Sequence, residues 1–394
     1  MKIAPQLLVG CTLALVLLPA CTTPDYSRKL PDGWPALLPL KPGEARPNFR
    51  EEWEARDEIL PALERSIEWT KKPSAANFFP IEGVSQERAL ASLERFRDLL
   101  KNSTDGRDFN GAVGVEFDIY KSAGWNGKGG GVLFTGYCTP ILDGNLTADA
   151  TYRYPLYGMP DDLVKGKDGA ILGQRRADGA VAPYPDRHAI EAGGLLKNKK
   201  LELVYLKDPL DAFIAHVNGS AVIRLPDGQE KRFGYAGKNG QPYTSLGAEL
   251  VKDKRLKASE VSLPAIREWG RKNPDLLQEY LERDKSFVFF LPIDGNPKGS
   301  LNVEVTAGRT LATDKTLFPR GAIVFVDCKL PMQSGSRRYD RFLFDQDTGG
   351  AIRTAGRADI YFGVGDSAEE IAGRTKAEGQ MYYLFLKEQR AGQP

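Results

Sequence analysis

The sequence predicts a mainly β protein of the α+β class, folded as a barrel or a sandwich. From about residue 111 onward, apolar and polar residues alternate in short runs with the period of two that half-buried strands show. Turn-forming residues, such as the Pro-Asp-Gly-Gln run at 226–229, separate these runs, and only a few stretches carry helical spacing. No internal repeat is visible, and the pattern alone does not select one kind of barrel.

The first residues have the features of a secretory signal. Lys2 precedes an apolar run from Leu7 to Leu18, and small residues lead up to Cys21. The run is about 12 residues long, whereas a membrane-spanning helix needs roughly 20. We expect residues 1–20 to be a signal peptide, with a short uncleaved anchor as the alternative. The end of the run resembles a bacterial lipobox, which implies lipidation of Cys21 and, with Thr22 after it, a periplasmic protein anchored to the outer membrane.

Proline-rich residues 21–48 predict a tether between the lipidated cysteine and the folded body. Apolar residues from Trp53 to Ile67 then recur at helical spacing, and a second such stripe follows at 89–100, with Ser85 placed to cap its first turn. Two further helices are expected at 262–271 and 274–283. The alternation predicts strands at 113–117, 132–134, 201–205, 221–225, 231–235, 322–327, 341–345 and 380–386.

Charge and composition exclude several classes of partner. The 394 residues, enough for two domains, are 41% hydrophobic and 27% charged, which is typical of a folded soluble body. With 54 basic against 52 acidic side chains, the chain has no net field to attract it to nucleic acid. Nucleic-acid binding is therefore not expected.

Two cysteines remain in the body after Cys11 and Cys21 are assigned to the N-terminal segment. Cys138 and Cys328 can pair in an oxidising compartment or remain two separate buried thiols, and the spacing leaves both alternatives open. The two histidines, His188 and His216, do not lie at metal-ligand spacing from either cysteine. We expect neither a metal nor a cofactor.

The densest group of chemically active residues lies near the C-terminus. Residues 345–353 read DQDTGGAIR, and the strand pattern RADIYFG at 357–363 follows. Alternation places Asp359 on one face of that strand with Tyr361, while Ala358 and Ile360 face the other way. A carboxyl in an apolar strand has a raised pKa if it is buried, as a general acid acting on a glycosidic oxygen requires. The alternative is a structural aspartate whose oxygens accept backbone N–H hydrogen bonds.

At these residues the chain resembles the MltA family of membrane-bound lytic transglycosylases, with its 3D-domain C-terminus. The stretch QDTGGAIRTAGRADIYFGVGDSAEEIAGR carries the most specific part of the resemblance. Other matches occur in order along residues 130–390: FTGYCTP (134–140), YRYPLYGMP (152–160), GYAGKNGQPYTSLG (234–247), AIREWG (265–270), FVFF (287–290) and GRTLATD (308–314).

The resemblance implies a lytic exotransglycosylase, a carbon–oxygen lyase that cleaves the β-1,4 bond between N-acetylmuramic acid and N-acetylglucosamine. Asp359 would be the single acid/base, and Asp347 would stabilise positive charge or orient Asp359. The residues themselves leave exo and endo action open. Two alternatives also remain: a hydrolytic glycosidase that uses Asp347 or Asp366 as a second carboxylate, and an inactive peptidoglycan-binding lipoprotein.

The same resemblance implies the supporting residues and the architecture. Expected substrate-binding residues are Thr135, Tyr137, Asn218, Ser220, Lys238, Asn239, Arg353 and Tyr361. Asn218 and Arg353 stand where the family usually has glutamine and lysine. A double-psi β-barrel would be built from 49–150 and 290–394, with a β-domain inserted at 151–289. Expected partners are glycan strands, the membrane through the lipid anchor, and cell-wall synthesis complexes, and the chain is expected to be a monomer.

Overall fold

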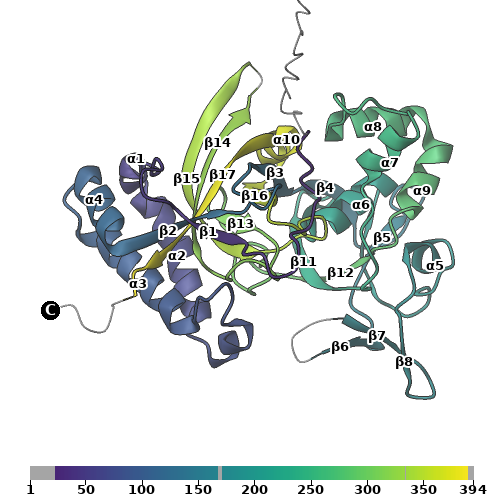
Figure 1. The fold of residues 1–394 in the computed structure, drawn as a ribbon. Helices are drawn as coiled ribbons and strands as arrows, with labels where there is room; N and C mark the ends of the chain where they lie inside the picture. The colour runs from purple at the N-terminus through teal and green to yellow at the C-terminus, as the bar shows by residue number, and fades with distance from the viewer. Residues whose placement is uncertain (1–22, 167–170, 333, 389–394) are drawn as a thin grey trace, which may run out of the picture.

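The computed structural model describes residues 23–166, 171–332 and 334–388, so the predicted signal peptide and Cys21 lie outside the described residues. The fold is mixed α/β with mostly sheet content, in agreement with the coarse prediction. Two sheets lie side by side in Figure 1, each covered by its own helices. We call the first sheet with its helices the first body, and the second sheet with its helices the second body. A small third sheet, made by β6, β7 and β8, projects from the second body.

The first sheet has eight strands in the order β1-β2-β17-β14-β15-β13-β16-β3. Their bounds are β1 Leu37–Pro39, β2 Phe117–Ser122, β3 Val132–Thr139, β13 Thr310–Ala312, β14 Ile323–Pro331, β15 Ser336–Asp347, β16 Arg357–Val364 and β17 Lys376–Leu386. Because β17 pairs with β3 as well as with β14, six of these strands form a closed circuit of pairings. The two ends of the chain therefore meet in one sheet.

Apolar side chains fill both sides of the first sheet. Val324 and Leu343 are fully buried cross-strand partners on β14 and β15, in one core cluster with Tyr383. A second cluster lies between the sheet and the N-terminal helices, where Ile59 and Phe96 are fully buried. The predicted helical stripes are thus confirmed as core-facing.

The N-terminal helices cover one side of this sheet (Figure 1). They are α1 Arg50–Glu54, α2 Arg56–Thr70, α3 Gln86–Asn102 and α4 Gly106–Glu116, with a 3-10 helix at Pro73–Phe78, and a C-terminal helix, α10, spans Asp366–Arg374. Ser85 caps α3 as predicted, because its side chain accepts a hydrogen bond from the backbone N–H of Arg88.

The strand predicted at 113–117 is wrong, since this segment ends α4 and strand β2 begins only at Phe117. Asp105 caps α4 by accepting hydrogen bonds from the backbone N–H groups of Arg107 and Asp108. Phe109 and Val113, four residues apart, are both fully buried against the sheet. This i,i+4 pair and the cap outweigh the short alternation that suggested a strand.

The proline-rich segment is not a free tether along its whole length. Residues 37–39 form β1 and pair with β2, and Ala36 is fully buried. The hydroxyl of Thr354 also donates a hydrogen bond to the carbonyl oxygen of Tyr26 at 2.6 Å. The reason is that a short apolar run, Ala36 to Leu38, finds an unpaired strand edge to cover.

The second sheet has six strands in the order β12-β11-β10-β4-β9-β5. The strands of the second body are β4 Ile141–Asn145, β5 Tyr154–Tyr157, β6 Leu163–Lys165, β7 Ile171–Arg175, β8 Val181–Ala182, β9 Glu202–Leu206, β10 Ala221–Arg224, β11 Glu230–Lys238 and β12 Val288–Pro292. Its helices are α5 Arg187–Glu191, α6 Pro209–Asn218, α7 Leu246–Lys252, α8 Leu263–Lys272 and α9 Pro274–Glu282. The sheet therefore starts before and ends after the predicted 151–289 insert.

Cys138 and Cys328 are both free and buried, so the disulfide alternative is wrong. Cys138 packs against Ala368 and Ala372 of α10, whereas Cys328 lies in the main core cluster of the first sheet. Burial raises the pKa of each thiol to about 12, which keeps both protonated.

Candidate active site

Asp359 lies in the middle of β16, between two neighbouring strands. It is the register partner of Thr135 on β3 and of Ala312 on β13. Ala358 and Ile360 are fully buried in the core, as the alternation predicted. The carboxyl therefore projects from the opposite face of the strand, away from the main core.

The carboxyl of Asp359 is set to hold a proton near neutral pH. Burial raises its pKa from 3.8 to about 7, and the negative charge of Asp347 adds to the rise. A hydrogen bond from Thr135 and the positive charge of Arg357 oppose this shift without cancelling it. Its Oδ1 is buried and has no hydrogen-bond partner among the described residues. The structural alternative, an aspartate satisfied by backbone N–H groups, does not fit this geometry.

Asp347, at the end of β15, has a different environment. Its Oδ2 accepts a hydrogen bond from the hydroxyl of Tyr137 at 2.7 Å. Its Oδ1 accepts backbone N–H hydrogen bonds from Ser300 and Thr348, both at 2.8 Å. Burial raises the pKa of Asp347, while these hydrogen bonds and the charge of Lys315 act in the opposite direction. The carboxyls of Asp347 and Asp359 are thus neighbours, and hydrogen bonds stabilise the charged form of Asp347 more than that of Asp359.

Beneath Asp347 lies a buried ion pair that the sequence analysis missed. Lys315 contacts Asp345, which is fully buried, and also donates to the hydroxyl of Thr313 at 3.1 Å. Asp345 further accepts hydrogen bonds from Thr313 and, at 2.8 Å, from Tyr383. The backbone N–H of Thr313 donates to the carbonyl oxygen of Asp347 at 3.1 Å, so this cluster supports the site from below.

A chain of hydroxyl groups joins the site to the second body. The Thr139 hydroxyl lies 2.9 Å from that of Tyr361 and 3.2 Å from that of Ser220. The rings of Tyr137 and Tyr361 are 5.1 Å apart at their centroids. The structure thus brings the predicted residues Tyr137, Tyr361 and Ser220 together, with Thr139, which was not predicted, as their link.

The two predicted asparagines make structural hydrogen bonds instead. Asn239 is only 2% exposed, and its side chain bonds the backbone of Pro185, Lys285, Gln241 and Phe287. That prediction is wrong, because the carboxamide has no free donor or acceptor for a glycan. Asn218 ends α6, donating to the carbonyl oxygen of Ile214 and accepting from the backbone N–H of Cys138. The Asn218 side chain thus links α6 of the second body to the backbone of β3 in the first body.

The cations near the site lack carboxylate partners. Within the described ranges, no carboxylate oxygen lies within 4.0 Å of a side-chain nitrogen of Lys238, Arg353 or Arg357. Lys238, at the end of β11, is close enough to Arg353 for the charge of that arginine to lower its pKa, in addition to the larger effect of burial. Arg357, which sequence reasoning missed, donates to the hydroxyl of Thr135 at 3.3 Å.

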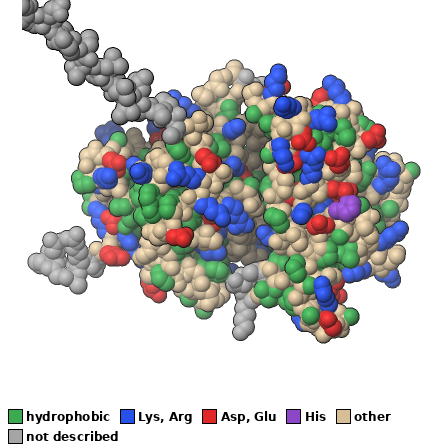
Figure 2. Space-filling view, turned by 45° about the vertical axis from the view of Figure 1, so that its right-hand side comes forward, with side chains coloured by type: hydrophobic (Ala, Val, Ile, Leu, Met, Phe, Trp, Pro, Cys, Tyr) green, Lys and Arg blue, Asp and Glu red, His purple; other side chains and the backbone are tan. Residues whose placement is uncertain are grey.

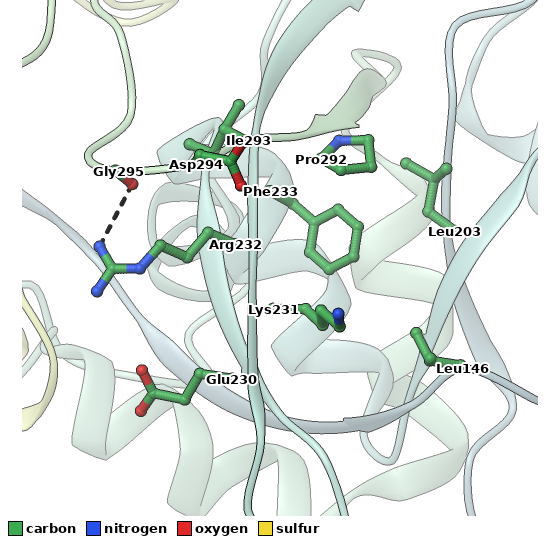
Figure 3. Close-up of a pocket in the computed structure, with 10 residues that line it drawn as sticks. All are labelled: Leu146, Leu203, Glu230, Lys231, Arg232, Phe233, Pro292, Ile293, Asp294 and Gly295. Carbon is green, nitrogen blue, oxygen red and sulfur yellow. Dashed lines mark hydrogen bonds between the residues drawn. The ribbon is translucent and has the colours of Figure 1, made fainter.

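Figure 2 shows a deep hollow between the two bodies, with Lys and Arg side chains along its rim. A separate cavity of about 560 Å³ opens on the second sheet. It is drawn in Figure 3, where Phe233, Pro292 and Leu203 line one side and the Arg232 guanidinium donates to the carbonyl oxygen of Gly295. Neither Asp347 nor Asp359 lines this cavity.

Over residues 23–166, 171–332 and 334–388, no group of three or more His, Cys, Asp or Glu side chains could hold a metal ion. In the same ranges, no helix is both long and apolar enough to cross a bilayer. The site combines the Asp359 carboxyl, whose raised pKa suits a proton donor, with the neighbouring Asp347 carboxyl and the hydroxyl groups of Tyr137, Thr139 and Tyr361. This geometry is typical of enzymes that use a protein carboxyl as a general acid.

Comparisons with known proteins give the family. Residues 133–291 match the MltA specific insert domain, and residues 309–385 match the 3D domain. Membrane-bound lytic murein transglycosylase A of Vibrio cholerae is 32% identical over 270 residues, which cover 67% of this chain and 68% of the relative. The Escherichia coli K12 protein of the same name is 34% identical over 261 residues, 65% of this chain and 66% of the relative.

Solved structures agree with this assignment. A membrane-bound lytic murein transglycosylase from Agrobacterium tumefaciens has a TM-score of 0.71 at 25% identity, covering 89% of this chain and 98% of that one. E. coli MltA with bound chitohexaose has a TM-score of 0.68 at 25% identity, covering 92% and 98%. The chain belongs to the MltA family of membrane-bound lytic murein transglycosylases, which confirms the resemblance inferred from its C-terminal motifs.

Proposed function

We propose that this chain is a lytic transglycosylase of peptidoglycan that uses Asp359 as its only acid/base. The observation that carries the proposal is the Asp359 carboxyl, whose pKa of about 7 lets it hold a proton at neutral pH. The relatives' names support the reaction class, and the bound chitohexaose in the E. coli structure supports a glycan as ligand.

In the first half of the reaction, Asp359 gives its proton to the oxygen that links N-acetylmuramic acid to N-acetylglucosamine. The bond between that oxygen and the anomeric carbon breaks, and the N-acetylglucosamine end leaves as an alcohol. Positive charge develops on the muramoyl ring, where the negative potential of Asp347 is favourable.

In the second half, the Asp359 carboxylate takes the proton of the muramoyl C6 hydroxyl. The C6 oxygen then bonds to the anomeric carbon and closes a 1,6-anhydro ring, and Asp359 is again protonated. Because the nucleophile belongs to the same sugar, attack is intramolecular and no second carboxylate has to hold a water. Atoms balance without addition of water.

The finer architecture and location belong to the same proposal. We infer that the closed circuit of six strands is a double-psi β-barrel, with the second sheet as its insert. Lipidation at Cys21 would place the body in the periplasm at the outer membrane, where murein strands and cell-wall synthesis complexes are the partners. Because Tyr26 already contacts Thr354, only about four residues remain between Cys21 and the body, a reach of roughly 15 Å when extended.

Mass spectrometry of purified murein, digested by the mature chain and by Asp359→Asn, tests the reaction. We expect anhydro-ended muropeptides from the wild type and a rate about 10³-fold lower from the variant. Asp366→Asn is the matched control, because Asp366 is an exposed residue in the first turn of α10 and is expected to retain full activity.

Reducing ends in place of anhydro ends would indicate a hydrolase, and a loss of activity in Asp366→Asn would identify its second carboxylate. No release by either protein, with both shown to be folded by circular dichroism, would contradict the enzymatic proposal and favour a binding protein.

A further inference from the structure

The strand that carries Asp359 also carries an arginine on the same face. Arg357 lies two residues before Asp359 on β16, so the two side chains leave the strand in the same direction. Their register partners on the neighbouring strand β3 are Leu133 and Thr135. The Arg357 guanidinium donates a hydrogen bond from Nη2 to the hydroxyl oxygen of Thr135 at 3.3 Å. Thr135 is therefore in contact with the guanidinium and adjacent to the carboxyl.

The direction of this hydrogen bond sets the direction of the next one. A guanidinium has no acceptor, so the Thr135 oxygen accepts and its single proton is left free. The neighbouring acceptor in the register is the Asp359 carboxyl, to which Thr135 gives a hydrogen bond. A hydroxyl that itself accepts from a cation is polarised and is a stronger donor. The charged form of Asp359 benefits more from such a donor than the protonated form does.

Two buried atoms on this face of β16 have no partner. Among the described residues, five buried side-chain nitrogen or oxygen atoms make no hydrogen bond, and Arg357 Nε and Asp359 Oδ1 are two of them. Native proteins satisfy most buried polar atoms, so a donor and an acceptor left unpaired two residues apart call for an explanation. A group whose charge changes during a reaction provides one, because a single fixed set of hydrogen bonds cannot suit both of its protonation states.

Other arginines with little exposure are held by structural contacts. Arg309 forms an ion pair with Glu52. Arg320 has no ion pair within the described ranges, but its guanidinium donates to the carbonyl oxygen of Lys315 at 3.1 Å. The only hydrogen bond of the Arg357 side chain to the described residues goes instead to a hydroxyl group beside the proposed acid. Holding the backbone or neutralising a structural carboxylate therefore does not explain Arg357.

We propose that Arg357 is a positioning residue for the reaction, which acts through the Thr135 hydroxyl to stabilise the Asp359 carboxylate between proton donation and proton return. The inference rests on the proposed function, in which Asp359 is ionised after the glycosidic bond breaks and must then accept the C6 proton. Burial and the charge of Asp347 both disfavour that ionised form. Arg357 opposes both effects through one hydroxyl group.

This contact keeps Asp359 usable in both halves of the reaction. A group that serves first as the acid and then as the base works best when its pKa is close to the working pH. The pKa of Asp359, about 7, is the result of burial, which raises it, and of Thr135 and Arg357, which lower it. Without Arg357 the carboxyl would be a weaker acid in the first half, so bond cleavage would be slower.

Titration of the Asp359 carboxyl by ¹³C NMR tests the contact independently of catalysis. The full mature chain is labelled at aspartate Cγ, and the Asp359 signal is assigned by its loss in Asp359→Asn. Arg357→Met removes the charge, Arg357→Lys keeps it, and Thr135→Val removes the hydroxyl but keeps a branched side chain. Lys376→Met is the matched control, because exposed Lys376 is the register partner of Thr135 on β17 and has no ion pair to any described residue.

We expect Arg357→Met and Thr135→Val each to raise the pKa of Asp359 by about one unit and to lower kcat on murein about tenfold, with KM within about twofold. The alkaline limb of kcat should move to higher pH by the same amount. Arg357→Lys should recover part of the loss. The double variant Arg357→Met/Thr135→Val should shift little more than either single variant, because both changes act through one hydrogen bond. Lys376→Met should leave the pKa of Asp359 within about 0.3 units.

An unchanged pKa of Asp359 in both Arg357→Met and Thr135→Val would overturn the inference and leave the proposed reaction intact. A shift in Lys376→Met as large as that in Arg357→Met, or additive shifts in the double variant, would overturn it too, because either result would show a general field in place of a directed hydrogen bond. A shifted pKa together with no anhydro product from the wild type would overturn the proposed reaction, and with it the role given to Arg357.

Discussion

Two carboxyl groups flank the short strand β13, and the chain treats them in opposite ways. Asp345 is the register partner of Leu311 on one side, and Asp359 is the partner of Ala312 on the other. Asp345 is fully buried, paired with Lys315 and hydrogen-bonded by Thr313 and Tyr383. Asp359 has no ion pair among the described residues and one oxygen without any hydrogen bond.

The difference separates a carboxylate that supports the fold from the carboxyl that we propose as the general acid. Every oxygen of Asp345 has a fixed partner, so its charge is compensated inside the fold. The environment of Asp359 instead disfavours its charged form, and its pKa of about 7 leaves it able to give and take a proton. The same residue type, two strands apart, therefore acquires its role from its neighbours.

Removing the partner of the structural carboxylate is expected to have the largest effect on stability. Lys315→Met leaves Asp345 buried and uncompensated, which should lower the free energy of unfolding by about 3–5 kcal/mol. Urea denaturation at pH 7 measures it. The double variant Lys315→Met/Asp345→Asn, which removes both charges but keeps an oxygen for Tyr383, should recover at least about half of the loss. The control is Lys329→Met, because Lys329 is an exposed lysine on β14 with no ion pair to any described residue. A Lys315→Met variant as stable as this control would contradict the structural role of the Lys315–Asp345 pair.

Removing the proposed catalytic carboxyl, Asp359, should instead stabilise the fold. Between pH 4 and 7 the folded chain holds a proton on Asp359 that the unfolded chain has lost, because the pKa of this group is about 7 in the fold against 3.8 in its absence. Its contribution to stability therefore falls as the pH rises through this window. Asp359→Asn should be more stable than the wild type by about 4 kcal/mol at pH 8 and equal to it below pH 4.

Thermal unfolding at pH 3.5, 6 and 8 measures this difference. A gap between the two proteins that does not change with pH would show that Asp359 is not the titrating group. The wild-type rate, in turn, should fall above pH 7 as the general acid loses its proton.

The smallest effect is expected at the hydrogen bond that supports Asp347. Tyr137→Phe removes the 2.7 Å bond, so the pKa of Asp347 should rise further and its negative potential should weaken. We expect kcat on murein to fall about tenfold with little change in KM. Tyr382→Phe is the control, because the Tyr382 hydroxyl makes no hydrogen bond within the described residues. A rise in KM with kcat unchanged would instead assign Tyr137 to substrate binding.

Sequence reasoning located the central residues of the site but not the network that supports them. Alternation placed Asp359 and Tyr361 opposite Ala358 and Ile360, and the period of two is a local property that tertiary contacts preserved. Lys315 escaped notice because a charged residue in a polar stretch carries no local sign of burial. Asn239 was mistaken for a ligand contact for a related reason, since its partners come from segments about 50 residues away.

The sequence by itself determined the chain's class and several of its strands, because periodicity, caps and ordered motifs depend on neighbouring residues. It could not decide that 113–117 completes a helix, that residues 37–39 join the sheet, or that Cys138 and Cys328 stay apart. Nor could it show that Asp345, Asp347 and Asp359 differ in their hydrogen-bond and ion-pair partners. These depend on desolvation and on partners from distant segments, and only the tertiary structure brings those groups within a few ångströms of one another.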